Sequence, residues 1–403
     1  MKRENLLNNL MKAAFVLGLV FQQAVSIKAA PGDLDITFGI GGKVMTQTGY
    51  DDKANAAAIQ ADGKIVVAGE RNIDGDINAL LARYNTDGSL DQSFGIGGFV
   101  IDAANGFRDS HLNAVAIQAD GKIVAAGYFF VLGGCFSRDQ SWVVRYNADG
   151  SRDTTFGGGD GEVENPYLYY IPGCPFSSYH YALAIQNDGK ILVAGSSIAS
   201  GSQSDFAAAR LNTDGTLDTS FNIDGLATYS IGSGNEKAYS AALHPTSGKI
   251  ILAGYTSTSS NNDFALILLS SGGLYDWNFG GTGKVTTNTG GIDVAESVAF
   301  QSNGKIIAAG RQSNGTNGTD FSVVRYHANG SLDTSFGTSG RSLHHSARFT
   351  IALSVSACNQ TAKSSPPDGA RTTTRSTRVT ISLFPVTTRT ARSTLHSAAT
   401  ANR

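Results

Sequence analysis

Oxygen-bearing side chains recur at a fixed spacing along this chain of 403 residues. The pattern Asn-x-Asp-Gly-x-x-Asp occurs at Asn85/Asp87/Asp91, Asn147/Asp149/Asp153 and Asn212/Asp214/Asp218. Clustered oxygens suit calcium, but a helix-loop-helix calcium loop needs ligands at alternate positions and a distant bidentate Glu. Asx turns and hairpin turns explain the same residues, because Asn and Asp side chains bond to the backbone of such turns. The pattern therefore predicts turns and no metal site.

The histidines show no catalytic spacing. His111, His180, His244 and His327 share no metal-ligand spacing, and the other three lie after residue 340. The sequence also lacks a nucleophile elbow, a phosphate loop and a zinc motif. We therefore predict no catalytic residue, no cofactor and no metal ligand, and hence a protein that is not an enzyme.

Two stretches concentrate aromatic side chains, residues 129–142 and residues 164–181. Their aromatic residues are Phe129, Phe130, Phe136, Trp142, Tyr167, Tyr169, Tyr170, Phe176, Tyr179 and Tyr181. Exposed aromatics on loops form a binding patch, for example for carbohydrate or another surface protein. The alternative is a small hydrophobic core that packs the two loops. Each stretch also holds one cysteine, and in an exported chain Cys135 and Cys174 are expected to form a disulfide, with two free thiols as the alternative.

A tandem repeat positions all of these residues. An Asp-x-x-Phe motif ends each unit, at Asp91/Phe94, Asp153/Phe156, Asp218/Phe221, Asp276/Phe279 and Asp333/Phe336. A partial copy with Phe38 precedes them, and consecutive phenylalanines lie 56 to 65 residues apart. That period is too long for a solenoid rung and matches a four-stranded blade. We expect each Asp to accept backbone N–H groups and each Phe to fill the seam between blades.

Within a unit, four apolar runs have strand length. In the first unit they are 43–48, 54–60, 64–69 and 79–85. Asp62-Gly63 between the second and third runs is a strong hairpin signal, because Gly supplies the positive φ of the turn. The third run, with Ile65 to Ala68 as its first copy, does not alternate polar with apolar residues, so both its faces must be buried. Sheets stacked face to face, as in radially packed blades, meet that condition.

These motifs resemble the delta-60 repeat, a tandem family of bacterial exported proteins. The resemblance rests on AIQ-x-DGKI-x-x-AG and on RYN-x-DGSLD-x-SFG-x-x-G, and it covers residues 31–340. It implies a propeller-like β architecture and brings no catalytic residues with it. The fourth unit departs most, because Leu268 stands where other units have Arg83, Arg145, Arg210 or Arg325.

The two ends of the chain differ from the repeats. Lys2 and Arg3, an apolar run over residues 13–21 and small residues up to Ala30 form a signal-peptide pattern over residues 1–30, and cleavage falls after Ser26 or Ala29. The apolar run is too short to span a membrane. The repeats and signal together carry 22 Lys/Arg against 32 Asp/Glu, which gives phosphate backbones no reason to bind.

Residues 341–403 hold nine Lys/Arg and one acid. We predict a disordered basic tail here, because its few apolar residues bury too little surface to offset the entropy of ordering. Read one base out of frame, residues 357–368 permit LQPDGKIVAAG and residues 379–402 permit SRYNTDGSLDTTFG, so the tail is interpreted as a frameshifted sixth repeat. A selected basic tail is the alternative.

The sequence thus predicts an all-β protein with about five intact four-stranded blades, in an incomplete or open ring with an unpaired edge. The function favoured is an exported, non-catalytic binding or scaffold module of the cell envelope or exterior. Its ligand would be a carbohydrate or a protein, and nucleic acid is not expected. A propeller-type hydrolase or lyase with a central-channel site is the first alternative, and a non-functional truncated product is the second.

Overall fold

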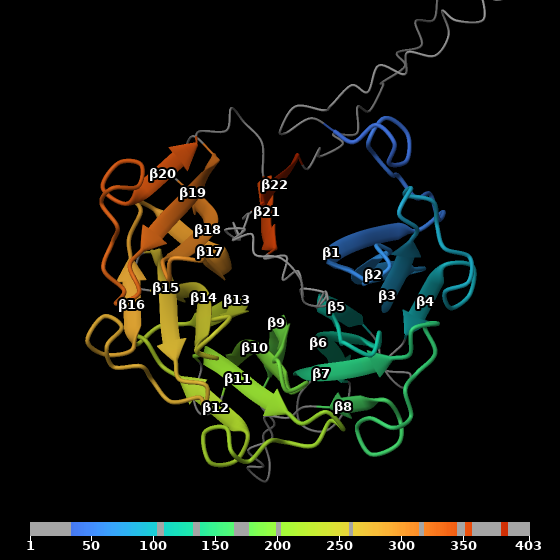
Figure 1. The fold of residues 1–403 in the computed structure, drawn as a ribbon, viewed down its shortest axis with the longest axis horizontal. Coiled ribbons are helices and arrows are strands. Elements are labelled where there is room, and N and C mark those ends of the chain that lie inside the picture. The colour runs from blue at the N-terminus through green and yellow to red at the C-terminus, as the bar shows by residue number, and fades with distance from the viewer. Residues whose placement is uncertain are drawn as a thin grey trace, which may run out of the picture. The chain divides into compact units, whose positions relative to one another are not determined.

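The computed structural model describes residues 34–102, 109–131, 138–164, 177–198, 203–257, 261–313 and 318–344, and two further strands. Within these residues, the strands form five four-stranded antiparallel sheets and one two-stranded sheet (Figure 1). The predicted all-β, propeller-like architecture is thereby confirmed. Over the same residues, no helix is long and apolar enough to cross a membrane.

Each four-stranded sheet is a blade whose strands pair in chain order. Blade one contains β1 (Asp51–Ile59), β2 (Ile65–Ile73), β3 (Asp76–Tyr84) and β4 (Phe99–Asp102). Blade two contains β5 (Ser110–Ile117), β6 (Ile123–Val131), β7 (Arg138–Tyr146) and β8 (Glu162–Glu164). Blade three contains β9 (Ser178–Ile185), β10 (Ile191–Ser197), β11 (Asp205–Leu211) and β12 (Leu226–Tyr229).

The remaining strands follow the same order. Blade four contains β13 (Glu236–Leu243), β14 (Ile250–Ser257), β15 (Asn262–Leu269) and β16 (Lys284–Thr287). Blade five contains β17 (Ile292–Phe300), β18 (Ile306–Ser313), β19 (Thr319–Tyr326) and β20 (Arg341–His344). The two-stranded sheet pairs β21 (Ile351–Ser356) with β22 (Thr380–Pro385). Thus β20 lies just past the boundary drawn at residue 340, and β21 and β22 lie within the predicted tail, whose disorder stays a prediction.

The blades pack face to face in sequence order, and β10 shows how. All seven residues of β10 are buried. Ile191 and Val193 pack with blade two, and Leu192 and Ala194 pack with blade four. The first strands of consecutive blades, from β1 to β17, also contact one another. The non-alternating apolar run therefore has the two buried faces that the sequence required.

The strand order differs from the sequence prediction by one position. The apolar run that follows each Asp-x-x-Phe motif was expected to open a new sheet. Instead it closes the preceding one, as β4 does when Val100 pairs with Leu81. The motif turns the chain back, since Asp91 N–H donates to Arg83 O, and the next strand therefore runs antiparallel to β3. Residues 43–48, expected as a first strand, form only a bridge between Gly39 and Lys43.

A small separate unit comprises the described residues 34–46 together with residues 86–89. In it, Gly39 N–H donates to Asp87 O at 2.7 Å. The partial repeat copy around Phe38 is thereby bonded to the turn that ends the first repeat. All sites described below lie in the other unit, residues 47–85 and 90–403.

Candidate functional site

The Asp-x-x-Phe motif forms an internal charge lock. In blade three, Asp218 Oδ2 accepts hydrogen bonds from Lys190 Nζ at 2.8 Å and from Arg210 Nε at 2.6 Å. Its Oδ1 accepts the N–H and the hydroxyl of Ser220. Arg210 also donates to Ser271 O of the next blade, and its guanidinium lies 4.9 Å from the centre of the Phe221 ring.

The same lock recurs around Asp91, Asp153 and Asp333. Blade four lacks the arginine, and Asp276 there bonds Lys249 at 2.6 Å and Asn278. Both oxygens of each carboxylate are thus engaged, and the lysine and arginine partners are contacts that the sequence reasoning did not name. The exposed Asp214 accepts the N–H of Thr216 at 2.9 Å, the geometry of an Asx turn. The described residues hold no group of three or more His, Cys, Asp or Glu that could bind a metal.

The phenylalanines of the motif lie in the core and form no part of a ligand site. Four of them are 0% exposed, and each belongs to a hydrophobic cluster that contains residues of two consecutive blades: Phe94, Phe156, Phe221 and Phe279. Because their side chains are completely buried, they serve the packing of the blades and cannot contact a ligand.

Phe336 differs from the expectation that every motif phenylalanine fills a seam between two blades. It is only half-buried, and it packs against a cluster of blade five that contains Ile307 and Phe321. The reason is its place in the chain, since no four-stranded sheet follows blade five within the described residues. Phe336 therefore covers the outer face of the last blade.

A β-bulge in the first strand of every blade creates a second repeated feature. The bulge residues are Asn55, Asn113, Tyr181, Tyr239 and Glu296. The residue before each bulge pairs with a glycine of the second strand, and these glycines are Gly69, Gly127, Gly195, Gly254 and Gly310. A Cβ at any of these glycines would lie 1.7 to 1.9 Å from a carbonyl oxygen of the first strand. The close backbone approach therefore requires glycine.

Three positions around each bulge vary widely among the repeats, whereas the Ala-Gly pair of the second strand recurs in every blade. One is the bulge residue itself. The second lies two residues earlier and is occupied by Lys53, His111, Tyr179, Lys237 and Val294. The third follows the glycine of the second strand and is occupied by Glu70, Tyr128, Ser196, Tyr255 and Arg311. Every blade therefore repeats the bulge, while the side chains at these three positions differ from blade to blade.

Six of these side chains form a continuous row, called here the tyrosine band. Its members are His111, Tyr128, Tyr179, Tyr181, Tyr239 and Tyr255. Consecutive ring centres lie 4.6, 5.0, 5.8, 5.0 and 6.0 Å apart. The row crosses blades two, three and four, and every member is half-buried. Such contacts between rings hold their edges and hydroxyls in fixed positions.

Charged groups flank the tyrosine band. Lys237 Nζ lies 5.3 Å from the Tyr179 ring centre, and the Tyr179 hydroxyl donates to Asp139 at 2.7 Å. Burial raises the pKa of Tyr128 and of Tyr239 to about 12, so both hydroxyls stay protonated donors at neutral pH. At the blade-five end, Arg311 pairs with Glu296 at 3.0 Å.

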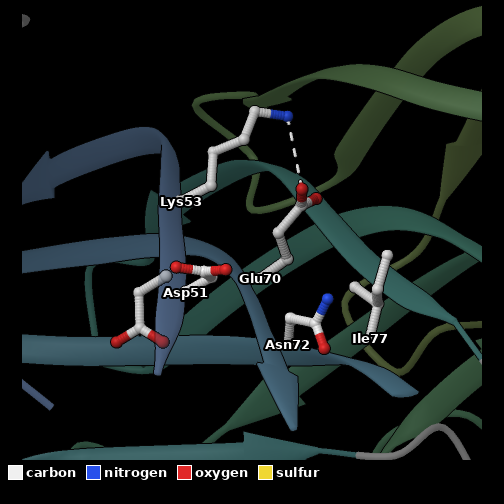
Figure 2. Close-up of a pocket in the computed structure, with 6 residues that line it drawn as sticks. Asp51, Lys53, Glu70, Asn72 and Ile77 are labelled. Atoms are coloured by element: carbon white, nitrogen blue, oxygen red, sulfur yellow. Dashed lines mark hydrogen bonds and ion pairs between the residues drawn. The ribbon is translucent and has the colours of Figure 1, made fainter. Parts of the chain in front are cut away.

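A pocket of about 200 Å³ lies at the blade-one end of the band. Its lining comprises Asp51, Asp52, Lys53, Glu70, Asn72 and Ile77, and Figure 2 shows the Lys53 amine directed at Glu70. Glu70 bonds His111 Nδ1 at 2.6 Å, and this contact lowers the Glu70 pKa to about 2. Pockets that enclose a whole small molecule measure roughly 300–1,000 Å³. This pocket therefore has room for one small polar group at the end of the band.

The residues of the predicted aromatic patch do not all lie on one surface. Tyr179 and Tyr181 join the tyrosine band, and Phe130 is half-buried in β6. Phe129 and Trp142 are fully buried and pack edge to face at 6.0 Å in the core between blades one and two. Their complete burial removes these two from the predicted contact surface. Outside the described residues lie Phe136, Tyr167, Tyr169, Tyr170, Phe176, Cys135 and Cys174.

The bases of the two aromatic stretches lie together. One leaves the end of β6 and returns at β7, and the other joins β8 to β9. Ser141 N–H donates to Ser178 Oγ at 3.2 Å, and Tyr128 contacts Tyr179 edge to face. Both stretches therefore leave the same end of blade two, beside the tyrosine band. The disulfide between them stays a prediction.

Sequence reasoning missed most of the band. His111 was noted only for its lack of metal spacing, and Tyr128, Tyr239 and Tyr255 were not singled out. A signal was present, because each stands in a column of the repeat where the residue type changes from copy to copy. Comparing the copies position by position, with the recurrent Ala-Gly pair of the second strand as reference, would have found them.

Comparison with known proteins supports this architecture. The family described as a domain of unknown function, DUF5122, β-propeller, matches residues 60–94, 118–156, 186–221, 246–277 and 301–336. The chain is a tandem β-propeller repeat protein. Each matched segment of this propeller protein contains the second and third strands of one blade, and the segments extend to or near the Asp-x-x-Phe phenylalanine.

The solved structures that are similar to this propeller protein include proteins with several different kinds of name. A protein of unknown function from Dyadobacter fermentans is 13% identical with a TM-score of 0.47, covering 73% of this chain and 83% of that one. Hydrazine synthase from Kuenenia stuttgartiensis is 11% identical with a TM-score of 0.41, covering 72% and 66%. The PQQ-bound aldose sugar dehydrogenase from Streptomyces coelicolor is 13% identical with a TM-score of 0.38, covering 73% and 85%. No curated protein sequence matches the chain.

Proposed function

We propose that this propeller protein is a non-catalytic binding module whose ligand, a carbohydrate, lies along the tyrosine band. The observation that carries the proposal is the continuity of the band over three blades at positions where the repeats diverge. The scaffold needs the bulge but not the tyrosines, since other copies carry Asn55, Ser196 or Glu296 at the same positions.

The chemistry of the band suits a sugar chain. Tyrosine combines an apolar ring edge with a hydroxyl, and sugars present apolar C–H groups beside hydroxyls. Lys237, Asp139 and the Glu70–His111 pair add charged hydrogen-bonding groups along the band. The pocket at Lys53 would hold one end of the ligand.

We further propose that the protein is exported to the envelope or exterior and that its repeats are of the delta-60 type. The support is the signal-peptide pattern of residues 1–30 and the repeat motifs quoted above. N-terminal sequencing of protein recovered outside the cytoplasm tests export. A start after Ser26 or Ala29 is expected, and a start at Met1 would contradict the proposal.

The binding proposal is tested by native electrophoresis in gels that contain soluble neutral or acidic polysaccharides. Retardation by at least one polysaccharide is expected. Tyr239→Ala should weaken the interaction about tenfold, since a lost aromatic contact of ~1.4 kcal/mol corresponds to that factor. Trp277→Ala is the matched control, because Trp277 is an exposed aromatic in the turn before β16.

Two outcomes would contradict the proposal. One is retardation by no polysaccharide, and the other is equal retardation of the wild type and Tyr239→Ala. Thermal unfolding of each variant separates lost binding from lost stability, which distinguishes a ligand surface from a small loop core. Shortening of the polysaccharide during incubation would favour the hydrolase or lyase alternative instead.

A further inference from the structure

Four buried oxygen atoms near the seam between blades four and five have no hydrogen-bond partner. They are Asp263 Oδ1, Thr289 Oγ1, Asp293 Oδ1 and Gln312 Oε1. Asp293 is 0% exposed, Gln312 is 7% exposed and Thr289 is 8% exposed. Buried polar atoms in native proteins are almost always bonded, so a group of such atoms indicates a missing partner.

Local contacts place these groups together. Asp293 in β17 lies directly opposite Gln312 in β18, so the two side chains share one face of the sheet. Thr289 N–H donates to Asp293 Oδ2 at 2.5 Å, and Gln312 Nε2 donates to Gly290 O at 2.6 Å. Asp263 is near the start of β15, which packs against β17, and its charge adds to burial in raising the pKa of Asp293. Asp293 and Gln312 thus each use their other side-chain polar atom in a local hydrogen bond, and Thr289 uses its backbone N–H. Asp263 contributes a second carboxylate.

The seam between blades three and four provides an internal comparison. There, Glu236 occupies the place of Asp293, and Thr256 occupies the place of Gln312. The Glu236 carboxylate accepts the N–H groups of Ile231 and Gly232 and the hydroxyl of Thr256. In blade five the acid is one methylene shorter, and the hydroxyl donor is replaced by an amide whose carbonyl is an acceptor. With these substitutions, Asp293 Oδ1 and Gln312 Oε1 are left without a hydrogen-bond partner, unlike the Glu236–Thr256 pair.

Blade one also has an acid at this position, but there the acid is paired with a cation. Asp52 there faces Arg71, which donates to both carboxylate oxygens at 2.8 and 2.7 Å. Asp293 instead faces the neutral Gln312. A buried carboxylate requires either a proton or a cation, because burial of an isolated negative charge is costly.

We propose that Asp263, Thr289, Asp293 and Gln312 bind a calcium ion. Calcium takes about six to eight oxygen ligands in irregular geometry, from carboxylates, amide carbonyls and water. Magnesium demands near-ideal octahedral geometry, and zinc prefers nitrogen and sulfur ligands, so neither suits this set. With two carboxylates, we expect a Kd in the range of extracellular calcium modules, about 10⁻⁴–10⁻³ M.

The site would join blades four and five, since Asp263 belongs to one blade and the other three residues to the next. Calcium binding therefore stabilises the packing of these two blades. This inference does not depend on the carbohydrate proposal, because none of its residues belongs to the tyrosine band.

The test uses the full chain after removal of divalent cations with a chelator. Calcium is added while binding is measured by calorimetry and stability by thermal unfolding. Calcium at about 100 times its Kd should shift the unfolding equilibrium about 100-fold towards the folded state. Terbium provides a second readout, because Tyr326 lies near enough for Asp293 to influence its pKa and should sensitise terbium luminescence.

Asp293→Asn should abolish the calcium-dependent shift and the terbium signal. In chelator this variant should be at least as stable as the wild type, because it removes a buried charge, so loss of binding is not confused with unfolding. Asp205→Asn is the matched control, since Asp205 occupies the place of Asp263 at the preceding seam, and it should keep the full calcium response. A wild type without a calcium response, or an equal response in Asp293→Asn, would overturn the proposal.

Discussion

The charge lock shows how one repeated aspartate stabilises the seams that follow blades one, two and three. In each of these blades the carboxylate bonds a lysine, an arginine and a turn, and the arginine donates to a carbonyl of the next blade. The sequence predicted that the Asp would engage backbone, and Asp218 does accept the Ser220 N–H. The lysine partner could not be predicted, because Lys190 is separated from Asp218 by 28 residues and only strand pairing brings them together.

The first prediction concerns loss of this carboxylate. Asp218→Asn leaves Arg210, whose side chain is 7% exposed, without its counter-charge. We expect the free energy of unfolding to fall by about 3–5 kcal/mol, the usual effect of breaking a buried ion pair. Asp276→Asn in blade four is the matched control, because its partner Lys249 is 43% exposed, and it should cost about 1 kcal/mol or less. Urea unfolding of both variants checks this, and equal losses would contradict the role assigned to the arginine.

The second prediction concerns acid. Hydrogen bonds from Lys64 and from Lys305 are the largest causes that hold the pKa of Asp91 and of Asp333 well below the ordinary value. A lowered folded-state pKa contributes stability above the unfolded pKa of about 4, and that stability is lost as the pH falls towards the folded value. The urea midpoint should therefore fall between pH 6 and pH 3.

Asp263 and Asp293, whose pKa values are raised by burial, act in the opposite sense. Asp91→Asn isolates the lock, because this variant should show a smaller fall in midpoint than the wild type over the same pH range. A midpoint that rises on acidification, or the same slope in both proteins, would count against the lock as the acid-sensitive element.

At the scale of elements, the bulge decides which side chains reach the tyrosine band. Period-two alternation in the first strand is interrupted at one position, and the residue there is displaced from the regular pairing. The sequence predicted strand lengths and hairpins from apolar runs and Asp-Gly turns. It could not locate the bulge, because a bulge shared by every copy leaves no difference among the repeats.

The third prediction tests the bulge directly. Gly254→Ala places a Cβ 1.7 Å from Lys237 O, which the strands can accommodate only by separating. We expect a loss of about 1–3 kcal/mol, in the range of overpacked cores, together with weaker carbohydrate binding. Gly272→Ala is the control, because its Cβ would meet only Ser270 Oγ at 3.8 Å, and its effect should stay within about 0.5 kcal/mol. Equal effects by thermal unfolding would contradict the requirement for glycine.

Blade closure was the part of the element prediction that failed. Apolar runs mark strands but do not show which sheet a strand joins. The deciding contact is the hydrogen bond from Asp91 N–H to Arg83 O, which returns the chain along β3. The conformation of the turn decides which sheet residues 99–102 join, and the apolar run alone does not show it.

For the whole molecule, repetition made the architecture predictable and the site unpredictable. Recurrence of Gly, Asp and Phe in every copy revealed the blade, because those residues serve backbone and packing. The tyrosine band lies in the columns that do not recur, and its members come from β5, β6, β9, β13 and β14. At the proposed calcium site, acids recur at the positions of Asp263 and Asp293, and what differs in blade five is the residue opposite Asp293, the neutral Gln312.

The fourth prediction concerns the tail. If residues 341–403 are a frameshifted repeat, resequencing the source DNA across codons 335–403 should reveal one base too many or too few. The restored frame should read LQPDGKIVAAG and then SRYNTDGSLDTTFG. An unchanged base count in independent clones would contradict the frameshift and leave a basic tail as the explanation.

Hydrogen exchange measures directly whether the ligand lies on the tyrosine band. The exchange of backbone amides is measured by mass spectrometry with and without a polysaccharide that retards the protein in gels. We expect added protection in β9, β13 and β14, the strands that carry Tyr181, Tyr239 and Tyr255. Protection confined to residues outside these strands, with none at the tyrosines, would contradict that location of the ligand.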